Sequence, residues 1–261
     1  MEITYFDYNT FVIRSNSKVV AIDPGGSFYF FHFFRTLIPE ELWEDITHII
    51  PTHGDPDHYW HTDRVAEASG AAVICNERMT KIVDGKRKII GPRKKGLQFT
   101  WDYDNLHTLK ENETIEADGL KVTGHKSTHG TLSISFGLFE KHFKPTPGER
   151  VGLGQMAFEF ELEGKSLINL GDSLLEEEAW QKITPPDVLM IPFAGINTMD
   201  YDEALQAIQI IKPKHVIPCH HNCAALFKKN ANPADAEGFK ADIEALGIQC
   251  HLMKPKETIT L

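Results

Sequence analysis

Residues 52–58 read Thr-His-Gly-Asp-Pro-Asp-His and bring two imidazoles and two carboxylates together in one short stretch. The apolar run over residues 46–50 predicts a buried strand, so these four side chains follow the carboxyl end of that strand. Gly54 and Pro56 suit neither a helix interior nor a strand interior, and they predict a tight loop that leads into a helix over residues 59–68. Because a loop can aim its side chains at one point, the stretch predicts a metal site rather than a solvated acidic turn.

Length and composition predict a single globular α/β domain over residues 1–261, since 41% of the residues are hydrophobic and 25% are charged. No apolar run approaches the roughly 20 residues that a membrane span needs, and the N-terminus lacks the features of a secretory signal, so we expect a cytoplasmic protein. A formal net charge of -10 argues against nucleic-acid binding, which depends on neutralising phosphates. The cysteines are too few and too scattered for a disulfide framework, and we expect reduced, buried thiols at Cys75, Cys219, Cys223 and Cys250.

The order of predicted strands and helices indicates an α/β fold. Three short alternating segments at the start of the chain predict a meander of strands, over residues 3–8, 10–14 and 18–23. The helix over residues 59–68 and a buried strand over residues 71–75 then follow in a βαβ rhythm. His61 lies three residues after His58 and would share a face of that helix, either as a pocket residue or as a plain surface histidine.

Later strands also lead into polar residues that can bind a metal. These candidates are, in chain order, His125 and His129, then Asp172, and finally His220 and His221. A capping box at Asp200 and Glu203 predicts the start of a helix before the last pair. The G-x-G over residues 152–154 neither follows a predicted strand nor opens a helix, so we do not interpret it as a nucleotide-binding loop.

Taken in this order, the motifs resemble those of the metallo-β-lactamase superfamily, whose metal-binding signature is H-x-H-x-D-H. Asp55 departs from the signature, because it stands where the family usually has its second histidine. The stretch around His220 resembles in particular the branch that includes the L-ascorbate-6-phosphate lactonase-like hydrolases. The resemblance implies a four-layer αββα sandwich with metals at the edge between two sheets. It also selects His129 over His125 and His220 over His221 as metal ligands.

By this resemblance, one metal would be held by His53, Asp55 and His129, the other by Asp57, His58 and His220, with Asp172 between them. Two divalent ions about 3.5–4 Å apart can share a hydroxide that attacks a lactone, ester or phosphodiester, which predicts a binuclear metallohydrolase. Asp57 would also orient that hydroxide. The proton donor to the leaving group is left open among His32, His125 and His221. Asp55 shifts the metal preference from zinc toward manganese or iron, so zinc and manganese are both expected and iron stays open.

Two alternatives belong to other functional classes. Iron-dependent oxidoreductases of the same superfamily, with two irons or one, could match Asp55, but the diiron enzymes normally add a flavin domain for which this chain has no room. A protein that keeps its metal only for stability is the other alternative, although a structural site needs only four closed ligands. Iron content and oxygen consumption would separate the oxidoreductases from a hydrolase.

The substrate is indicated only by charge. Residues 81–95 carry seven lysines and arginines against Asp84 alone, which indicates an anionic small molecule such as a phosphorylated one, or else a solvated hairpin. Residues 27–37 are rich in phenylalanine at a predicted loop, and they could line a substrate pocket, form a homo-oligomer interface or pack onto the core. The stretch 143–150, with two prolines, is predicted to be an exposed insertion.

Overall fold

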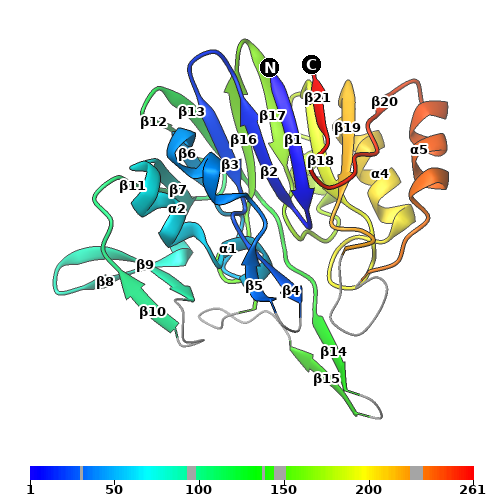
Figure 1. Ribbon diagram of the computed structural model, residues 1–261. Helices are drawn as coiled ribbons and strands as arrows, with labels where there is room; N and C mark the ends of the chain where they lie inside the picture. Colours follow the sequence, from blue (N-terminus) through cyan, green and yellow to red (C-terminus); the bar gives the residue numbers. More distant parts are fainter. Residues whose placement is uncertain (30–31, 93–97, 137–138, 144–150, 224–231) are drawn as a thin grey trace.

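Two seven-stranded sheets form the centre of the computed structural model, which describes residues 1–29, 32–92, 98–136, 139–143, 151–223 and 232–261 (Figure 1). The strands of the first sheet are, in spatial order, β11 (Leu106–Leu109), β7 (Ala72–Asn76), β6 (His48–Ile50), β3 (Val19–Ile22), β2 (Thr10–Arg14), β1 (Glu2–Asp7) and β21 (Thr258–Thr260). Those of the second are β12 (Thr114–Ala117), β13 (Leu120–His125), β16 (Ala157–Leu162), β17 (Lys165–Asn169), β18 (Val188–Pro192), β19 (His215–Cys219) and β20 (Gln249–Cys250).

Each sheet combines an antiparallel part with a parallel part. In the first sheet β1, β2 and β3 form the predicted antiparallel meander, and β3, β6, β7 and β11 run parallel. In the second sheet β12, β13, β16 and β17 are antiparallel, and β17, β18, β19 and β20 are parallel. Because parallel strands end at the same edge of a sheet, the loops that follow β3, β6, β17, β18 and β19 can meet there.

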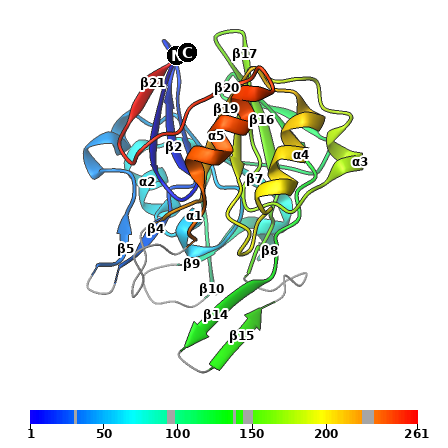
Figure 2. The ribbon, with the colours of Figure 1, turned by 90° about the vertical axis from the view of Figure 1, so that its right-hand side faces the viewer.

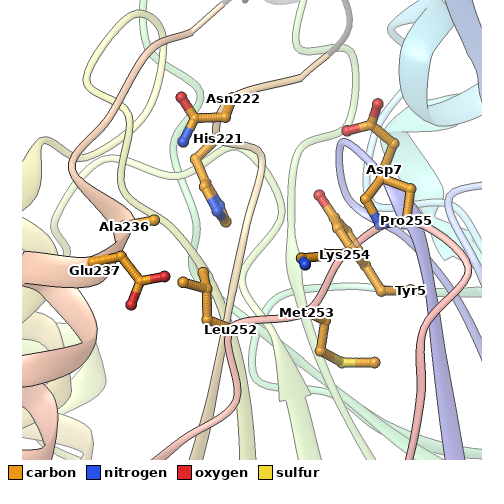
Figure 3. A pocket seen from close by; sticks show the side chains of 10 residues that line it. All are labelled: Tyr5, Asp7, His221, Asn222, Ala236, Glu237, Leu252, Met253, Lys254 and Pro255. Atoms are coloured by element: carbon orange, nitrogen blue, oxygen red, sulfur yellow. The ribbon is translucent and has the colours of Figure 1, made fainter.

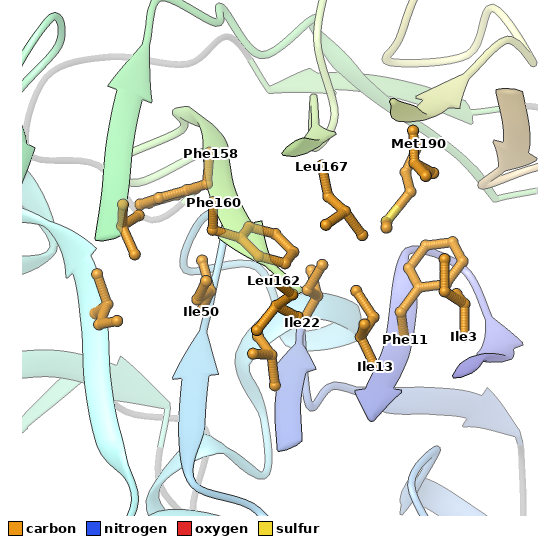
Figure 4. Packing of buried hydrophobic residues seen from close by; sticks show 14 of the residues in the cluster. Ile3, Phe11, Ile13, Ile22, Ile50, Phe158, Phe160, Leu162, Leu167 and Met190 are labelled. Carbon is orange, nitrogen blue, oxygen red and sulfur yellow. The ribbon is translucent and has the colours of Figure 1, made fainter. Parts of the chain in front are cut away.

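The two sheets pack face to face through apolar side chains that alternate along each strand (Figure 4). Phe158, Phe160 and Leu162 are spaced by two residues on β16, and all three are buried in this core. Ile13 on β2 and Ile22 on β3 come from the opposite sheet. A one-residue slip in β16 would turn these aromatic side chains away from the core, so the alternation fixes the register.

Helices cover the outer faces of both sheets (Figures 1 and 2). The 3-10 helices η1 (Glu40–Asp45) and η2 (Glu77–Met79), the helices α1 (Pro56–Tyr59) and α2 (Thr62–Ser69), and a small sheet of β8 (Thr80–Val83), β9 (Lys86–Pro92) and β10 (Gln98–Trp101) accompany the first sheet. The helices α3 (Glu177–Trp180), α4 (Tyr201–Ile211) and α5 (Ala236–Ala245) cover the second. The predicted αββα sandwich is therefore confirmed, as is the capping box that begins α4.

The prediction of one helix over residues 59–68 is wrong, because two short helices stand in its place. Pro56 occupies the first turn of α1, so Asp57 and His58 lie on a helix rather than on the predicted loop. The N–H of His61 donates to the carbonyl of Pro24 at 2.9 Å instead of continuing the helix, and α2 begins only at Thr62. His61 therefore does not share a helix face with His58.

The phenylalanine-rich segment forms a hairpin and not the predicted loop. Its strands β4 (Gly26–Tyr29) and β5 (His32–Thr36) pair in antiparallel fashion, as expected of aromatic residues, which favour strands. A second hairpin, β14 (Leu132–Phe136) and β15 (Phe139–Phe143), projects from the body of the molecule (Figure 1). Residues 144–150 of the predicted insertion lie outside the described residues.

Two expectations about the chain as a whole can be compared with the fold. All four cysteines are buried and unpaired, as predicted. Among the described residues, no helix combines the length and the apolar character that crossing a membrane requires.

Candidate metal centre

Seven predicted side chains meet at the carboxyl-terminal edge of the two sheets. They follow β6, β13, β17 and β19, and their ligand atoms form three overlapping groups, each within 4.8 Å. The groups are His53, Asp55 and His129; Asp57, His58 and His220; and His53, His58 and Asp172. The structure therefore brings together every residue of the two predicted ligand sets.

In the first set, the carboxylate of Asp55 lies between two imidazoles. Its Oδ2 is 3.6 Å from His53 Nε2 and 3.4 Å from His129 Nε2. Two ligands bound tetrahedrally to one zinc ion at about 2.0–2.2 Å are themselves about 3.3–3.6 Å apart. These three side chains thus have the spacing of metal ligands.

The second set repeats this arrangement. Asp57 Oδ2 lies 3.5 Å from the Nε2 atoms of both His58 and His220. Asp172 faces both sets, because its Oδ1 is 3.4 Å from His58 Nε2, while its Oδ2 is 3.3 Å from His220 Nε2 and 3.8 Å from His129 Nε2. A carboxylate in this position can bridge two cations.

Several of these inward-facing atoms are buried without a hydrogen-bond partner among the described residues. They are the Nε2 atoms of His53, His58 and His220, and Oδ1 of Asp172. Buried polar atoms in folded proteins almost always have a partner. Four unpartnered polar atoms at one point fit divalent cations, which would satisfy all of them.

The outer nitrogen of each of three histidines is held by a hydrogen bond. His58 Nδ1 donates to Asp23 Oδ2 at 2.6 Å, and His129 Nδ1 donates to the carbonyl of Gly130 at 2.6 Å. His53 Nδ1 contacts Thr52 Oγ1 at 3.0 Å. With the proton on Nδ1, the lone pair of Nε2 faces the centre, as metal binding requires.

Asp23 is a supporting residue that the sequence analysis did not assign. Besides His58, it accepts hydrogen bonds from the N–H of Thr52 at 2.6 Å and from Thr52 Oγ1 at 2.7 Å. Because the Thr52 hydroxyl donates its proton to Asp23, its oxygen is free to accept from His53. Asp23 thus fixes one imidazole directly and a second through one intervening side chain.

Opposite charges in the cluster shift its pKa values in opposite directions. Burial alone would lower the pKa of His58, but Asp172, Asp57 and Asp23 raise it well above the usual range. The pKa values of His129 and His220 are raised in the same way, against the effect of burial, by neighbouring carboxylates.

The carboxylates respond to the same contacts with the opposite sign. Burial would raise the pKa of Asp57, but His58 and His220 hold it well below its usual range. Histidines lower the pKa values of Asp55 and Asp172 too, despite their burial. Without cations the cluster therefore favours protonated imidazoles at His58, His129 and His220, whereas burial lowers the pKa of His53, and the binding of cations must release the protons of the first three.

Glycines beside the centre allow the backbone to approach it. The N–H of Gly152 donates to Asp55 Oδ1 at 2.8 Å, and a Cβ at Gly152 would lie 2.6 Å from His129 Cβ. The carbonyl of Leu153 accepts from the N–H of Gly54 at 2.9 Å. The G-x-G stretch therefore supports the loop that carries His53 and Asp55, a role that its sequence alone does not indicate.

Asn197, in the loop after β18, is another supporting residue that no sequence motif indicates. Its Nδ2 donates to Asp172 Oδ2 at 2.8 Å, and its carbonyl accepts from the N–H of Gly130 at 3.0 Å. It is only partly buried. Asn197 thus fixes one oxygen of the central carboxylate and links it to the loop that carries His129.

The other predicted histidines lie outside the ligand groups. His125 pairs with Glu159 at 2.7 Å, and the ring of His221 packs against Phe193 with centroids 4.8 Å apart. Burial lowers the pKa of His221 to about 4, so at pH 7 this imidazole is neutral and is a poor proton donor to a leaving group. The side chain of His32 lies outside the described residues. His61 is buried and not on the surface.

A cavity of about 480 Å³ is lined by His221, the neighbour in sequence of His220, but by none of the seven candidate ligands (Figure 3). Its walls come from β1, from residues 221–222, from the start of α5 and from the segment before β21. Its lining is mixed in charge, with Asp7, Glu237 and Lys254.

The basic segment lies on the small sheet beside α1. Lys81, Lys86 and Arg87 are exposed there, whereas Lys88 is paired with Asp102 at 3.0 Å. Residues 93–95 lie outside the described residues. Among the described residues, Lys81, Lys86 and Arg87 therefore form no ion pair with a carboxylate. The structure does not place them at the ligand groups.

Comparison with known proteins agrees with this architecture. Residues 2–220 match the family model described as the beta-lactamase superfamily domain, and the chain belongs to that superfamily. It is 28% identical over 268 residues to a UPF0173 metal-dependent hydrolase of Carboxydothermus hydrogenoformans, covering 100% of both chains. A UPF0173 metal-dependent hydrolase of Nanoarchaeum equitans is 25% identical over 263 residues, again with 100% of both covered. These descriptions are broader than the lactonase-like branch that the sequence resembles.

Solved structures share the fold at lower identity. Igni18, a metallo hydrolase from Ignicoccus hospitalis, has a TM-score of 0.67 at 22% identity, covering 99% of this chain and 97% of that one. CmlA, a diiron β-hydroxylase from Streptomyces venezuelae, has a TM-score of 0.66 at 13% identity; the match covers 100% of this chain but 54% of CmlA.

Proposed function

We propose that the protein is a hydrolase that depends on two divalent cations. One cation would be held by His53, Asp55 and His129, the other by Asp57, His58 and His220, with Asp172 shared between them. The observation that carries this proposal is the convergence of these side chains with buried, unpartnered Nε2 atoms facing inward. The relatives that match along their whole length are described as metal-dependent hydrolases, which supports the same reaction class.

Bound cations would polarise the scissile bond and lower the pKa of an attacking water. The chain itself supplies charge and orientation. Asp57 stays ionised at neutral pH because His58 and His220 outweigh its burial, so it can accept a hydrogen bond from the attacking water. Asn197 holds Asp172 by one oxygen and keeps that carboxylate turned toward both ligand sets.

We propose a lactone, an ester or a phosphodiester of an anionic small molecule as the substrate. The exposed cations of Lys81, Lys86 and Arg87 support a negative charge on the substrate, because they would attract it by their field. A lactonase acting on a phosphorylated sugar is the narrowest form of this proposal, and it follows from the resemblance around His220.

Hydrolysis is favoured over the oxidoreductase alternative. CmlA shares the fold, but the match covers little more than half of its length, and a likeness at 13% identity carries no activity across. Asp55 still leaves the metal open among zinc, manganese and iron, because each accepts carboxylate and imidazole ligands.

The test begins with metal analysis of the untagged protein, followed by assays on bis(p-nitrophenyl) phosphate and on a phosphorylated sugar lactone after reconstitution with zinc, manganese or iron. We expect two cations per chain and turnover of at least one substrate. His53→Ala and Asp172→Ala should abolish turnover and lower the metal content without changing the circular dichroism spectrum. His107→Ala is the matched control, since this histidine of β11 is hydrogen-bonded to Asn105 and should leave both unchanged.

Full activity in His53→Ala or Asp172→Ala would contradict the proposed ligands. Bound iron together with oxygen uptake, and no hydrolysis, would instead support the oxidoreductase alternative.

A further inference from the structure

Asn9, in the turn between β1 and β2, is fully buried and uses every hydrogen-bonding position of its side chain. Its Nδ2 donates to Asp23 Oδ2 at 2.6 Å and to Asn169 Oδ1 at 2.8 Å. Its Oδ1 accepts from Asn169 Nδ2 at 2.9 Å and from the thiol of Cys219 at 3.2 Å. An asparagine amide offers two N–H donors and two acceptor lone pairs, so none is left over.

Two of these partners hold candidate metal ligands in place. Asp23 accepts the proton of His58 Nδ1 at 2.6 Å. Asn169 Oδ1 accepts at 2.9 Å from the N–H of the residue that directly precedes Asp172. The reciprocal amide pair of Asn9 and Asn169 joins residues 160 positions apart, and so links a support of His58 to a support of Asp172.

The same turn also holds His220. Cys219, which donates to Asn9, directly precedes it, and the N–H of His220 donates to the carbonyl of Tyr8 at 2.7 Å. Tyr8 and His220 have φ values of 50° and 53°, in the left-handed region that residues other than glycine rarely adopt. Such strained conformations persist only where surrounding contacts hold them in place. Here the hydrogen bond between Tyr8 and His220 constrains both residues.

Asp23 fixes the direction of the hydrogen bonds in this network. Because the Asp23 carboxylate can only accept, the NH₂ group of Asn9 must face it, and its oxygen must face Cys219 and Asn169 Nδ2. The amide of Asn169 is oriented in turn, with its oxygen toward the backbone N–H before Asp172. A buried network that is satisfied throughout specifies one arrangement of its members.

The three ligands supported in this way are His58, Asp172 and His220. The first set has other supports, since Gly152 holds Asp55 and Gly130 holds His129. His53 reaches the network only through Thr52, one hydrogen bond further away.

We propose that Asn9 is a positioning residue that sets the second ligand set, Asp57, His58 and His220, against Asp172. The inference rests on the proposed two-cation centre. Asn9 touches no ligand itself and acts through Asp23, Asn169 and Cys219, so its effect should be larger on the cation of the second set than on the other, which it reaches only through the shared Asp172 and through Thr52.

The test is a titration of the metal-free protein with zinc in competition with a chromophoric chelator, which resolves the two equivalents. In Asn9→Ala, we expect the affinity for the second zinc to fall about 10- to 100-fold, the usual cost of removing a support behind a metal ligand. The affinity for the first zinc, held by His53, Asp55 and His129, should fall much less. Ile208→Ala is the control, because this fully buried residue of α4 packs on the outer face of the second sheet.

Urea unfolding gives the stability of each variant. The zinc affinities of an Asn9 variant are compared with those of Ile208→Ala when both have lost a similar amount of stability. Asn9→Ser and Cys219→Ala remove fewer of these contacts and replace Asn9→Ala if that variant does not fold. Both should lower the affinity for the second zinc more than the affinity for the first.

Two unchanged affinities in the Asn9 variants would overturn the inference. An equal loss of both affinities, matched by Ile208→Ala, would also overturn it, because it would reveal a general loosening of the fold. A wild-type protein that binds fewer than two zinc ions would refute the proposed function itself, before any variant is compared.

Discussion

Gly25 lies directly against the backbone of α1, and replacing it by alanine should disable the second ligand set. An alanine Cβ at this position would lie 1.6 Å from the carbonyl oxygen of Asp57 and 2.7 Å from the backbone nitrogen of His58. Real Cβ atoms essentially never approach closer than 3.0 Å, so α1 must move by about 1.4 Å or more. The opposing atoms belong to the backbone, and no change of side-chain rotamer can relieve the contact.

A movement of this size separates Asp57 and His58 from His220. Metal sites hold their ligand distances within about 0.2 Å, and a misplacement of about 1 Å in an active site can cost about 100-fold in rate. We therefore expect kcat/KM of Gly25→Ala to fall about 100-fold or more, which corresponds to about 2.7 kcal/mol of transition-state stabilisation.

The measurement is the rate of hydrolysis at saturating zinc, together with zinc affinity and urea unfolding of the same preparation. Gly70→Ala is the matched control. A Cβ there would meet nothing within 4 Å, although its φ of 71° makes alanine strained, at a cost of about 1–2 kcal/mol in stability. The control should lose stability and keep its activity. Wild-type activity and zinc affinity in Gly25→Ala would refute the reasoning.

Four further predictions concern the conditions and the substrate. Because His58, His129 and His220 have raised pKa values, zinc must displace protons, and its apparent affinity should increase as the pH rises through those values; a flat profile from pH 6 to 9 would contradict this. The protonated imidazoles also stabilise the metal-free protein. Their contribution to the free energy of unfolding is fully present below about pH 6.5 and is lost as the pH rises through their raised pKa values, so the urea midpoint should fall over that range. Removing zinc with a chelator, from a free concentration 100 times Kd, should cost about 2.7 kcal/mol for each bound ion and lower Tm by about 5–10 °C per ion in a scanning fluorimeter, whereas an unchanged Tm would argue against a bound metal. Replacing Lys81 and Lys86 by glutamate should lower kcat/KM for an anionic substrate and leave a neutral ester unaffected; equal losses on both substrates would exclude steering by charge.

The residues of the centre differ in how readily the sequence reveals them. His53, Asp55, Asp57 and His58 are adjacent in sequence, so their pattern predicts a site directly. Asp172 and His220 are single residues, and only the order of family-like motifs made them candidates.

The supporting residues have no comparable sequence signal, because their roles depend on contacts across the fold. Asn9 meets Asn169 only after both sheets have formed, and an isolated asparagine in a turn is common. Gly152 and Gly154 have positive φ, which explains why glycine is found there but does not identify their neighbours. Asn197 acts through one long-range hydrogen bond to Asp172.

The helix break at His61 was missed for a similar reason. Residues 59–68 have acceptable local helix propensity, and the break arises because the carbonyl of Pro24 offers a competing partner to the N–H of His61. The strands were predicted more accurately, since the alternation of apolar residues reports the buried face of a sheet directly.

Each proposed ligand set draws residues from the loops of both sheets. The first joins His53 and Asp55, which follow β6, to His129 after β13, and the second joins Asp57 and His58 to His220 after β19. Neither set can form before the two sheets have docked. If docking comes late in folding, bound cations should leave the refolding rate nearly unchanged and slow the unfolding rate instead. The metal centre would then determine the kinetic stability of the protein, and the lifetime of the native state would depend on how slowly the cations dissociate.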